Sequence, residues 1–134
     1  MPITYKIDHE RKTVFAKGFG VLTDEDVFGY QREVWSREDT RGYSELIDMR
    51  GVEQIALPSM DRVRDLANLS AEMDPGKTPS KFAIVAGSDL AFGLGRMYEA
   101  YRGMNPRSSK EVKVFRILED ALKWLDEGSA GKGS

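Results

Sequence analysis

Alternating apolar and polar positions open the chain and predict a β-hairpin. Ile3, Tyr5 and Ile7 alternate with polar residues, and a second alternation follows around Phe15. A period of two residues is typical of a strand that has one side in a core and the other in solvent. Because the polar residues 9–11 separate the two runs, the sequence predicts two antiparallel strands joined by a turn.

A helical period replaces this alternation from residue 23 onward. Thr23 is followed three residues later by Asp26, which is the spacing of a capping box at the start of a helix. A second helix is expected after Pro58, with Ser59 as its N-cap, and a third after Ser88. A short fourth helix completes the pattern before residue 128.

Short, nearly continuous apolar runs between these helices predict buried strands. The runs occupy residues 45–49, 81–86 and 112–117, and the first is expected to end at Arg50. Residues 52–57 have no clear period, so we expect a connection there.

The predicted elements follow the order β-β-α-β-α-β-α-β-α, which is an α/β arrangement. Strands that alternate with helices favour a mostly parallel sheet with right-handed crossovers, and the N-terminal hairpin adds one antiparallel edge. Residues 1–127 are expected to form a single domain. Residues 128–134 carry no apolar side chain larger than that of alanine, which predicts a disordered tail.

Composition and charge limit the compartment and the partners. The chain of 134 residues has 20 Lys and Arg against 22 Asp and Glu, and its formal charge of −2 gives no general attraction to nucleic acid. The absence of cysteine excludes disulfides, thiolate metal sites and cysteine nucleophiles. Because there is no basic region followed by an apolar run at the start, and no apolar stretch of membrane-spanning length, we expect a cytoplasmic protein without membrane insertion.

Three stretches carry a likeness to a known fold family. Residues 46–52 are LIDMRGV, residues 83–93 are AIVAGSDLAFG, and residues 96–99 are RMYE. Together with the order of elements, they resemble the SpoIIAA-like fold that STAS domains share with the CRAL-TRIO lipid carriers, and within it the small bacterial STAS-like proteins. The resemblance implies a regulatory or protein-interaction module, with a protein partner or a homodimer as its assembly.

The chain departs from that family at one functional position. In the phosphorylated STAS regulators, which the strand at residues 46–48 resembles, the chain leads to a serine at the start of the next helix. Here Leu57 and Pro58 stand in that place, and Ser59 follows one residue later. Proline has no hydroxyl to phosphorylate. Ser59 is therefore either an N-cap or a displaced phosphate acceptor at a helix N-terminus.

Four polar residues follow two predicted strands and form the candidate binding site. Asp48 and Arg50 stand at the end of one strand, and Ser88 and Asp89 at the end of another. Open α/β sheets bind ligands at the carboxyl ends of their strands, so these side chains could hold a small anion or a polar head group. Capping and turn formation explain the same residue types, so both interpretations stay open.

The third predicted helix is unusually rich in large apolar groups. Tyr98 lies on its main apolar face, whereas Phe92 and Met104 fall outside it. This surplus would cover an interface or line a pocket for an apolar ligand. Phe92, Tyr98 and the nearby Arg96 complete the predicted binding residues.

Two glycines lie inside the third predicted helix, where glycine is unfavourable. Gly93 and Gly95 match neither the dinucleotide fingerprint nor the P-loop. Glycine in a helix costs about 1 kcal/mol relative to alanine, so these positions indicate close packing, a bend, or a ligand or partner that lies against the backbone. Of these we expect close packing.

Catalytic motifs are not assembled in this sequence. His9 is the only histidine and lies in a predicted turn, which does not support a catalytic triad. The acidic residues 24–26 occupy one helical turn, where they match the helix dipole, so we predict no metal, cofactor or catalytic residues. The sequence favours a non-enzymatic interaction module, and the alternative is a carrier of a small molecule or lipid head group with a cleft at the carboxyl ends of the strands.

Overall fold

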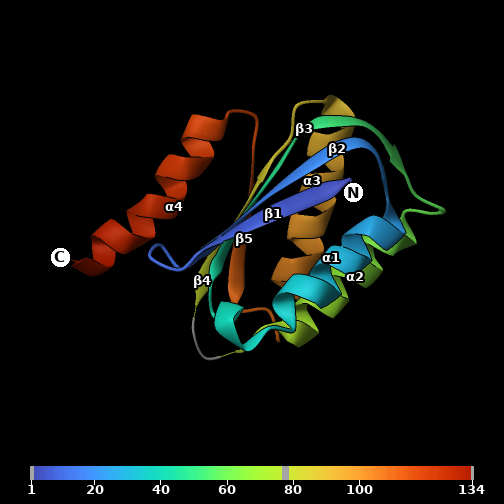
Figure 1. Ribbon diagram of the computed structural model, residues 1–134. Coiled ribbons are helices and arrows are strands. Elements are labelled where there is room, and N and C mark those ends of the chain that lie inside the picture. The colour runs from blue at the N-terminus through green and yellow to red at the C-terminus, as the bar shows by residue number, and fades with distance from the viewer. Residues whose placement is uncertain (1, 77–78, 134) are drawn as a thin grey trace.

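A computed structural model gives the fold of the chain. It describes residues 2–76 and 79–133, and from residue 128 onward it describes the course of the backbone alone. The elements of the described part, shown in Figure 1, are β1 (Ile3–Asp8), β2 (Thr13–Thr23), α1 (Asp24–Trp35), a 3₁₀ helix (Glu38–Thr40), β3 (Ser44–Ala56), α2 (Asp61–Met73), β4 (Ser80–Val85), α3 (Asp89–Met104), β5 (Lys110–Phe115) and α4 (Leu118–Gly133). The tail expected at residues 128–134 lies outside the fully described residues and stays a prediction.

The strands form one sheet in the order in which they occur along the chain. β1 is antiparallel to β2, and Ile3 pairs with Gly18 in their register. β2, β3, β4 and β5 are parallel to one another. The predicted hairpin, the mostly parallel sheet and the order of elements are therefore confirmed.

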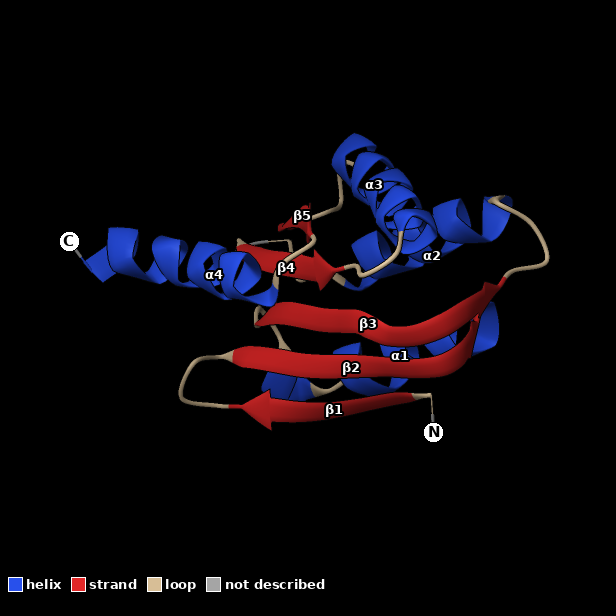
Figure 2. Ribbon diagram, turned by 90° about the horizontal axis from the view of Figure 1, so that it is seen from above, coloured by secondary structure: helices blue, strands red, loops and turns tan. Residues whose placement is uncertain are grey.

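β3 is longer than the sequence predicted. It continues past Arg50 to Ala56 because β2 stays paired with it over the whole distance. A Cβ at Gly51 would lie 2.9 Å from the carbonyl oxygen of Gly18, so the two strands approach too closely for a side chain there. The expected strand end at Arg50 and the expected connection at residues 52–57 are wrong. This part of the chain is a two-stranded extension of the sheet beyond β4 and β5 (Figure 2).

The helices cover the two faces of the sheet unequally. α1, α2 and α3 lie on one face and α4 lies on the other, as Figures 1 and 2 show. The larger core lies beneath the three helices. A small cluster of Leu46, Ala83, Val85 and Ala121 lies between α4 and the sheet. A layer with three helices can enclose space that a single helix cannot, and the candidate site lies there.

Two helix starts agree with the sequence. The Thr23 hydroxyl accepts a hydrogen bond from the Asp26 amide, and the Asp26 carboxylate accepts one from the Thr23 amide, which confirms the capping box of α1. The Ser88 hydroxyl accepts a hydrogen bond from the Ala91 amide at the start of α3. Both caps rest on short-range contacts that a sequence motif can specify.

The start of α2 differs from the expectation. Met60 precedes its first residue and already has helical backbone angles (φ −66°, ψ −22°). Ser59 therefore does not cap α2, and this prediction is wrong. The carbonyl oxygen of Ser59 instead accepts a hydrogen bond from the Arg62 amide, in a turn that leads into the helix.

Candidate functional site

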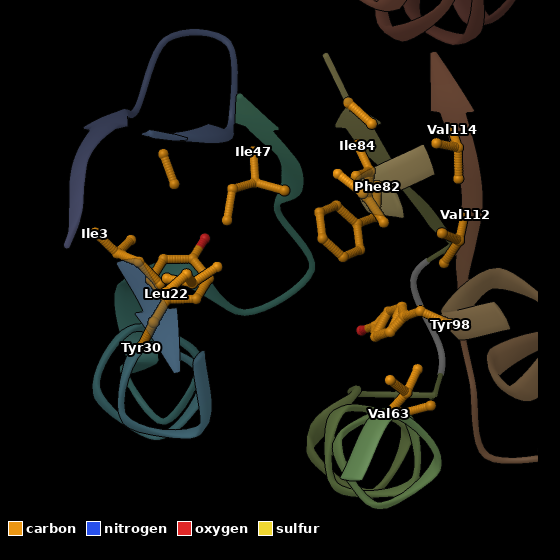
Figure 3. Packing of buried hydrophobic residues seen from close by; sticks show 14 of the residues in the cluster. Ile3, Leu22, Tyr30, Ile47, Val63, Phe82, Ile84, Tyr98, Val112 and Val114 are labelled. Carbon is orange, nitrogen blue, oxygen red and sulfur yellow. The ribbon is translucent and has the colours of Figure 1, made fainter. Parts of the chain in front are cut away.

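A cavity of about 130 Å³ lies between the sheet and the three helices of the thicker layer. Its apolar wall comes from the sheet, from α1, from the connection after β3, from α2 and from α3, through Leu22, Val27, Ile47, Leu57, Val63, Leu66, Phe82, Ile84 and Leu94. Figure 3 shows part of this layer, with Tyr30 of α1 and Tyr98 of α3 entering it from different helices. Small-molecule sites are built in this way, as largely apolar spaces with a few polar groups.

A buried cluster of charged and aromatic groups borders the cavity. Glu45 lines the cavity and accepts hydrogen bonds from the Tyr30 hydroxyl (2.7 Å), the Trp35 indole nitrogen (3.2 Å) and the Lys110 ammonium (3.1 Å). The side chains of Glu45 and Lys110 are 3% and 5% exposed. Lys110 Nζ also lies 3.1 Å from the centroid of the Trp35 ring. The carboxylate therefore has its charge balanced and both of its oxygens hydrogen-bonded.

Burial sets the ionisation of this cluster. Removal from water raises the pKa of the Tyr30 hydroxyl well above its usual range, and the Glu45 carboxylate adds to the effect. The same loss of water lowers the pKa of Lys110, while the charge of Glu45 opposes that shift. Tyr30 thus stays neutral, and Glu45 favours the charged form of Lys110.

A second buried network ties the helices together around the cavity. Gln31 accepts a hydrogen bond from the Ser70 hydroxyl (2.8 Å), which joins α1 to α2. Arg102, which is 2% exposed, donates to the Tyr98 hydroxyl (2.6 Å) and to Asp74 (2.5 Å). Burial raises the pKa of Tyr98. These contacts fix the positions of the helices, and with them the shape of the cavity.

An ion pair stands at the edge of the cavity, between the starts of α1 and α2. Arg62 Nε donates to Asp24 Oδ2 at 2.8 Å, and its guanidinium lies 4.2 Å from the centroid of the Phe28 ring. This hydrogen bond lowers the pKa of Asp24. Since α1 follows β2 directly, the ion pair lies at the carboxyl ends of the strands.

Asp48 and Arg50 come together on the opposite face of the sheet. Arg50 makes a two-pronged contact with Asp48 (2.9 and 2.8 Å), which lowers the pKa of the carboxyl. With Lys17 and Phe19 they border a shallow hollow. A Cβ at Gly87 would lie 3.4 Å from Arg50 Cα, so the turn after β4 is adjacent.

Ser88 and Asp89 take part in separate contacts. Ser88 caps α3, whereas the Asp89 carboxylate accepts a hydrogen bond from Arg116 at 2.7 Å. The Arg116 guanidinium also lies 4.5 Å from the centroid of the Phe92 ring. The side chains of the two residue pairs after the strands thus have different partners, and their role in binding stays a prediction.

The other predicted binding residues do not share one site. Tyr98 lines the cavity. Ser59 is exposed on the surface before α2. Arg96 is exposed and lies 3.6 Å from Glu99 on the same helix. The sequence therefore located one member of the cavity wall.

The two glycines of α3 have different surroundings. A Cβ at Gly95 would lie 3.1 Å and 3.2 Å from the methyl groups of Val114, and Gly95 lines the cavity. A Cβ at Gly93 would have no neighbour within 4 Å among the described residues. Close packing is confirmed for Gly95 and is wrong for Gly93.

Comparison with known proteins bears on the fold. No family model and no curated protein matches the chain. A crystal structure of an uncharacterized protein of the DUF3478 family from Shewanella loihica PV-4, described as having a SpoIIAA-like fold, superposes with a TM-score of 0.57. The superposition covers 92% of this chain and 93% of that one, at 23% sequence identity. The fold is SpoIIAA-like.

Within this SpoIIAA-like fold, the buried charges are the residues that sequence reasoning missed. The alternation of side chains along a strand could have identified two of them, Glu45 and Lys110. Glu45 shares its side of β3 with Ile47, and Lys110 shares its side of β5 with Val112 and Val114. A charged residue in phase with the apolar side of a strand indicates a buried charge, and two such residues indicate an ion pair.

Metal binding and membrane spanning can be checked directly for this SpoIIAA-like domain. Across residues 2–76 and 79–133, no three metal-binding side chains of His, Cys, Asp or Glu cluster in space. In that same part of the chain, no helix has the length and apolar character needed to cross a bilayer.

Proposed function

We propose that this chain is a non-enzymatic binding protein that holds a small molecule in the cavity between the sheet and α1, α2 and α3. The observation that carries the proposal is the cavity itself, about 130 Å³ in volume and walled by three helices and the sheet. A space of this kind needs no large rearrangement to accept a ligand.

The position of the cavity supports the same function. Asp24 and Arg62, at its edge, belong to the first turns of helices that follow β2 and β3. Ligands of open α/β sheets bind beside the carboxyl ends of the strands, which supports a binding role for this cavity, although Asp48, Arg50 and Ser88 do not line it.

An NMR titration with toluene tests this function. We expect toluene to shift amide resonances of α3 around Gly95 and to leave those of α4 around Leu122 unchanged. Leu66→Phe places a ring into the cavity wall, so it should weaken toluene binding by at least about tenfold. Native mass spectrometry of the protein purified from cells gives a second measurement, the mass of a bound molecule.

The matched control is Leu122→Phe. Both leucines are half-buried, but Leu122 belongs to α4 and packs on the other face of the sheet. The control should bind toluene like the unchanged protein. Equal weakening in both variants, or no shift with toluene and none with any charged or longer probe, would refute cavity binding.

A protein-interaction role is the second candidate, and exposed apolar residues favour it. Five of them stand in segments at the carboxyl ends of the strands: Phe19, Val21, Met60, Leu90 and Ile117, each between 44% and 55% exposed. Exposed large apolar side chains favour a contact surface. Sedimentation velocity should detect a concentration-dependent homodimer that Leu90→Ser weakens. A strict monomer that captures no partner would oppose this role.

A further inference from the structure

We infer that the ligand of this cavity is an uncharged apolar molecule about the size of one six-membered ring, and that the wall disfavours charged molecules and long lipid chains. The inference rests on the proposed binding function and specifies its ligand class. It follows from the charges, the hydrogen bonds and the volume of the wall.

The charges of the wall are already compensated within the protein. Asp24 is paired with Arg62 at 2.8 Å, and Glu45 is paired with Lys110 at 3.1 Å. Arg62 has a further acidic neighbour in Asp65, at 3.3 Å. A charged ligand would lose its water and would have to displace one of these partners to gain another, whereas an uncharged ligand avoids both costs.

The neutral polar groups of the wall are engaged as well. Tyr30 donates to Glu45, Tyr98 accepts from Arg102, and Gln31 accepts from Ser70. A ligand with several strong donors or acceptors would enter a space whose polar groups are already occupied, and some of its own groups would lose their hydrogen bonds. Apolar contact with residues such as Leu66 and Leu94 is what the wall offers.

The volume limits the size of the ligand. A protein cavity of about 150 Å³ with an apolar wall accepts benzene or xenon. The cavity here has about 130 Å³, which fits a single ring and is too small for the acyl chain of a lipid. The ligand class therefore differs from that of a lipid carrier.

A ligand series tests the inference on the intact chain. Toluene, benzoate and benzylammonium share one ring and differ in charge, and decanol tests chain length. We expect toluene to bind at least about tenfold more tightly than each of the other three, as measured by the NMR titration. Equal or tighter binding of benzoate, benzylammonium or decanol would overturn the inference and leave the binding function intact. If toluene and the other probes all fail to bind, the proposed function itself is wrong.

Charge compensation at the edge can be tested separately. Asp24→Asn leaves Arg62 without its closest partner, so benzoate should gain about tenfold in affinity while toluene is unaffected. Asp61→Asn is the control, because it removes the same charge from an exposed carboxylate at the start of α2 that pairs with Arg64. Circular dichroism confirms that both variants are folded. An equal gain in the two variants, or none with Asp24→Asn, would show that the Asp24–Arg62 pair does not set the selectivity.

Discussion

On the face covered by α1, α2 and α3, the sheet carries an ion pair with both partners buried in an apolar layer, whereas on the face covered by α4 a buried aspartate is paired with a half-exposed arginine. β3 places Glu45 on the first face and Asp48 on the second. Glu45 reaches Lys110 at 3.1 Å, with both side chains at most 5% exposed. Asp48 reaches Arg50 at 2.8 Å, but 48% of the arginine side chain is exposed. The two pairs have similar lengths and very different surroundings.

The distance between two charges therefore does not by itself decide how much an ion pair contributes to stability. Water screens the contact between Asp48 and Arg50, so breaking it costs little. Lys110 has no access to such screening, and loss of its partner leaves a buried, uncompensated charge. The buried pair also borders the candidate cavity, so the same contact that neutralises the wall supports the fold.

Removal of the buried carboxylate should have the largest effect. Glu45→Gln keeps the size of the side chain but leaves Lys110 charged and unpaired, so we expect the free energy of unfolding to fall by about 3 kcal/mol or more at pH 7. Urea denaturation followed by circular dichroism measures the loss. A loss below about 1 kcal/mol would contradict the contrast between the two faces.

The pH dependence of that loss checks its cause. Burial lowers the pKa of Lys110, so between its folded and unfolded pKa values the folded state binds fewer protons and stability rises with pH. The stability deficit of Glu45→Gln should therefore shrink as the pH rises from 7 toward the unfolded-state lysine pKa of about 10.4, because the buried lysine loses its proton below that value. The double variant Glu45→Gln with Lys110→Met should recover most of the stability at pH 7. A deficit that is constant with pH would mean that lost packing, and not charge, is the cause.

The two glycines of α3 allow a similar comparison within one helix. We expect substitutions there to change the free energy of unfolding by an intermediate amount. Gly95→Ala presses a methyl group against Val114, and strain of this kind costs about 1–3 kcal/mol, less the gain of about 1 kcal/mol in helix propensity. We expect a net loss of about 1 kcal/mol, measured by thermal denaturation.

Gly93→Ala is the matched substitution two residues away. Gly93 is exposed, and a methyl group there meets open space, so we expect a gain of about 0.5–1 kcal/mol. If both variants lost stability equally, the packing difference between the two positions would be wrong.

The features that sequence predicted are those set by short-range contacts. Thr23 and Asp26 are three residues apart and form their capping box as the motif requires. The hairpin and the parallel strands follow from local periodicity and from chirality that all such folds share. The one cavity residue that was predicted, Tyr98, stood out through the helical spacing of its neighbours.

The features that sequence missed depend on distant parts of the chain. Glu45 and Lys110 are 65 residues apart, so neither explains the other until the sheet is assembled. β3 continues past Arg50 because β2 remains beside it, and no local pattern in β3 records that pairing. Gly93 and Gly95 look alike in sequence, and the orientation of α3 toward Val114 separates them.

Loss of the half-exposed Asp48–Arg50 pair should have the smallest effect. Asp48→Asn removes the charge that holds Arg50, and after screening by water we expect a loss of less than about 1 kcal/mol at pH 7, measured by urea denaturation. The contact with Arg50 lowers the pKa of Asp48, so this stabilisation is present above the unfolded pKa of about 3.9 and is lost as the pH falls toward the folded value. The unchanged protein and the variant should therefore converge in stability below about pH 4. If Asp48→Asn lowered the free energy of unfolding as much as Glu45→Gln, or if its effect persisted in acid, the two ion pairs would not differ in their contribution to stability.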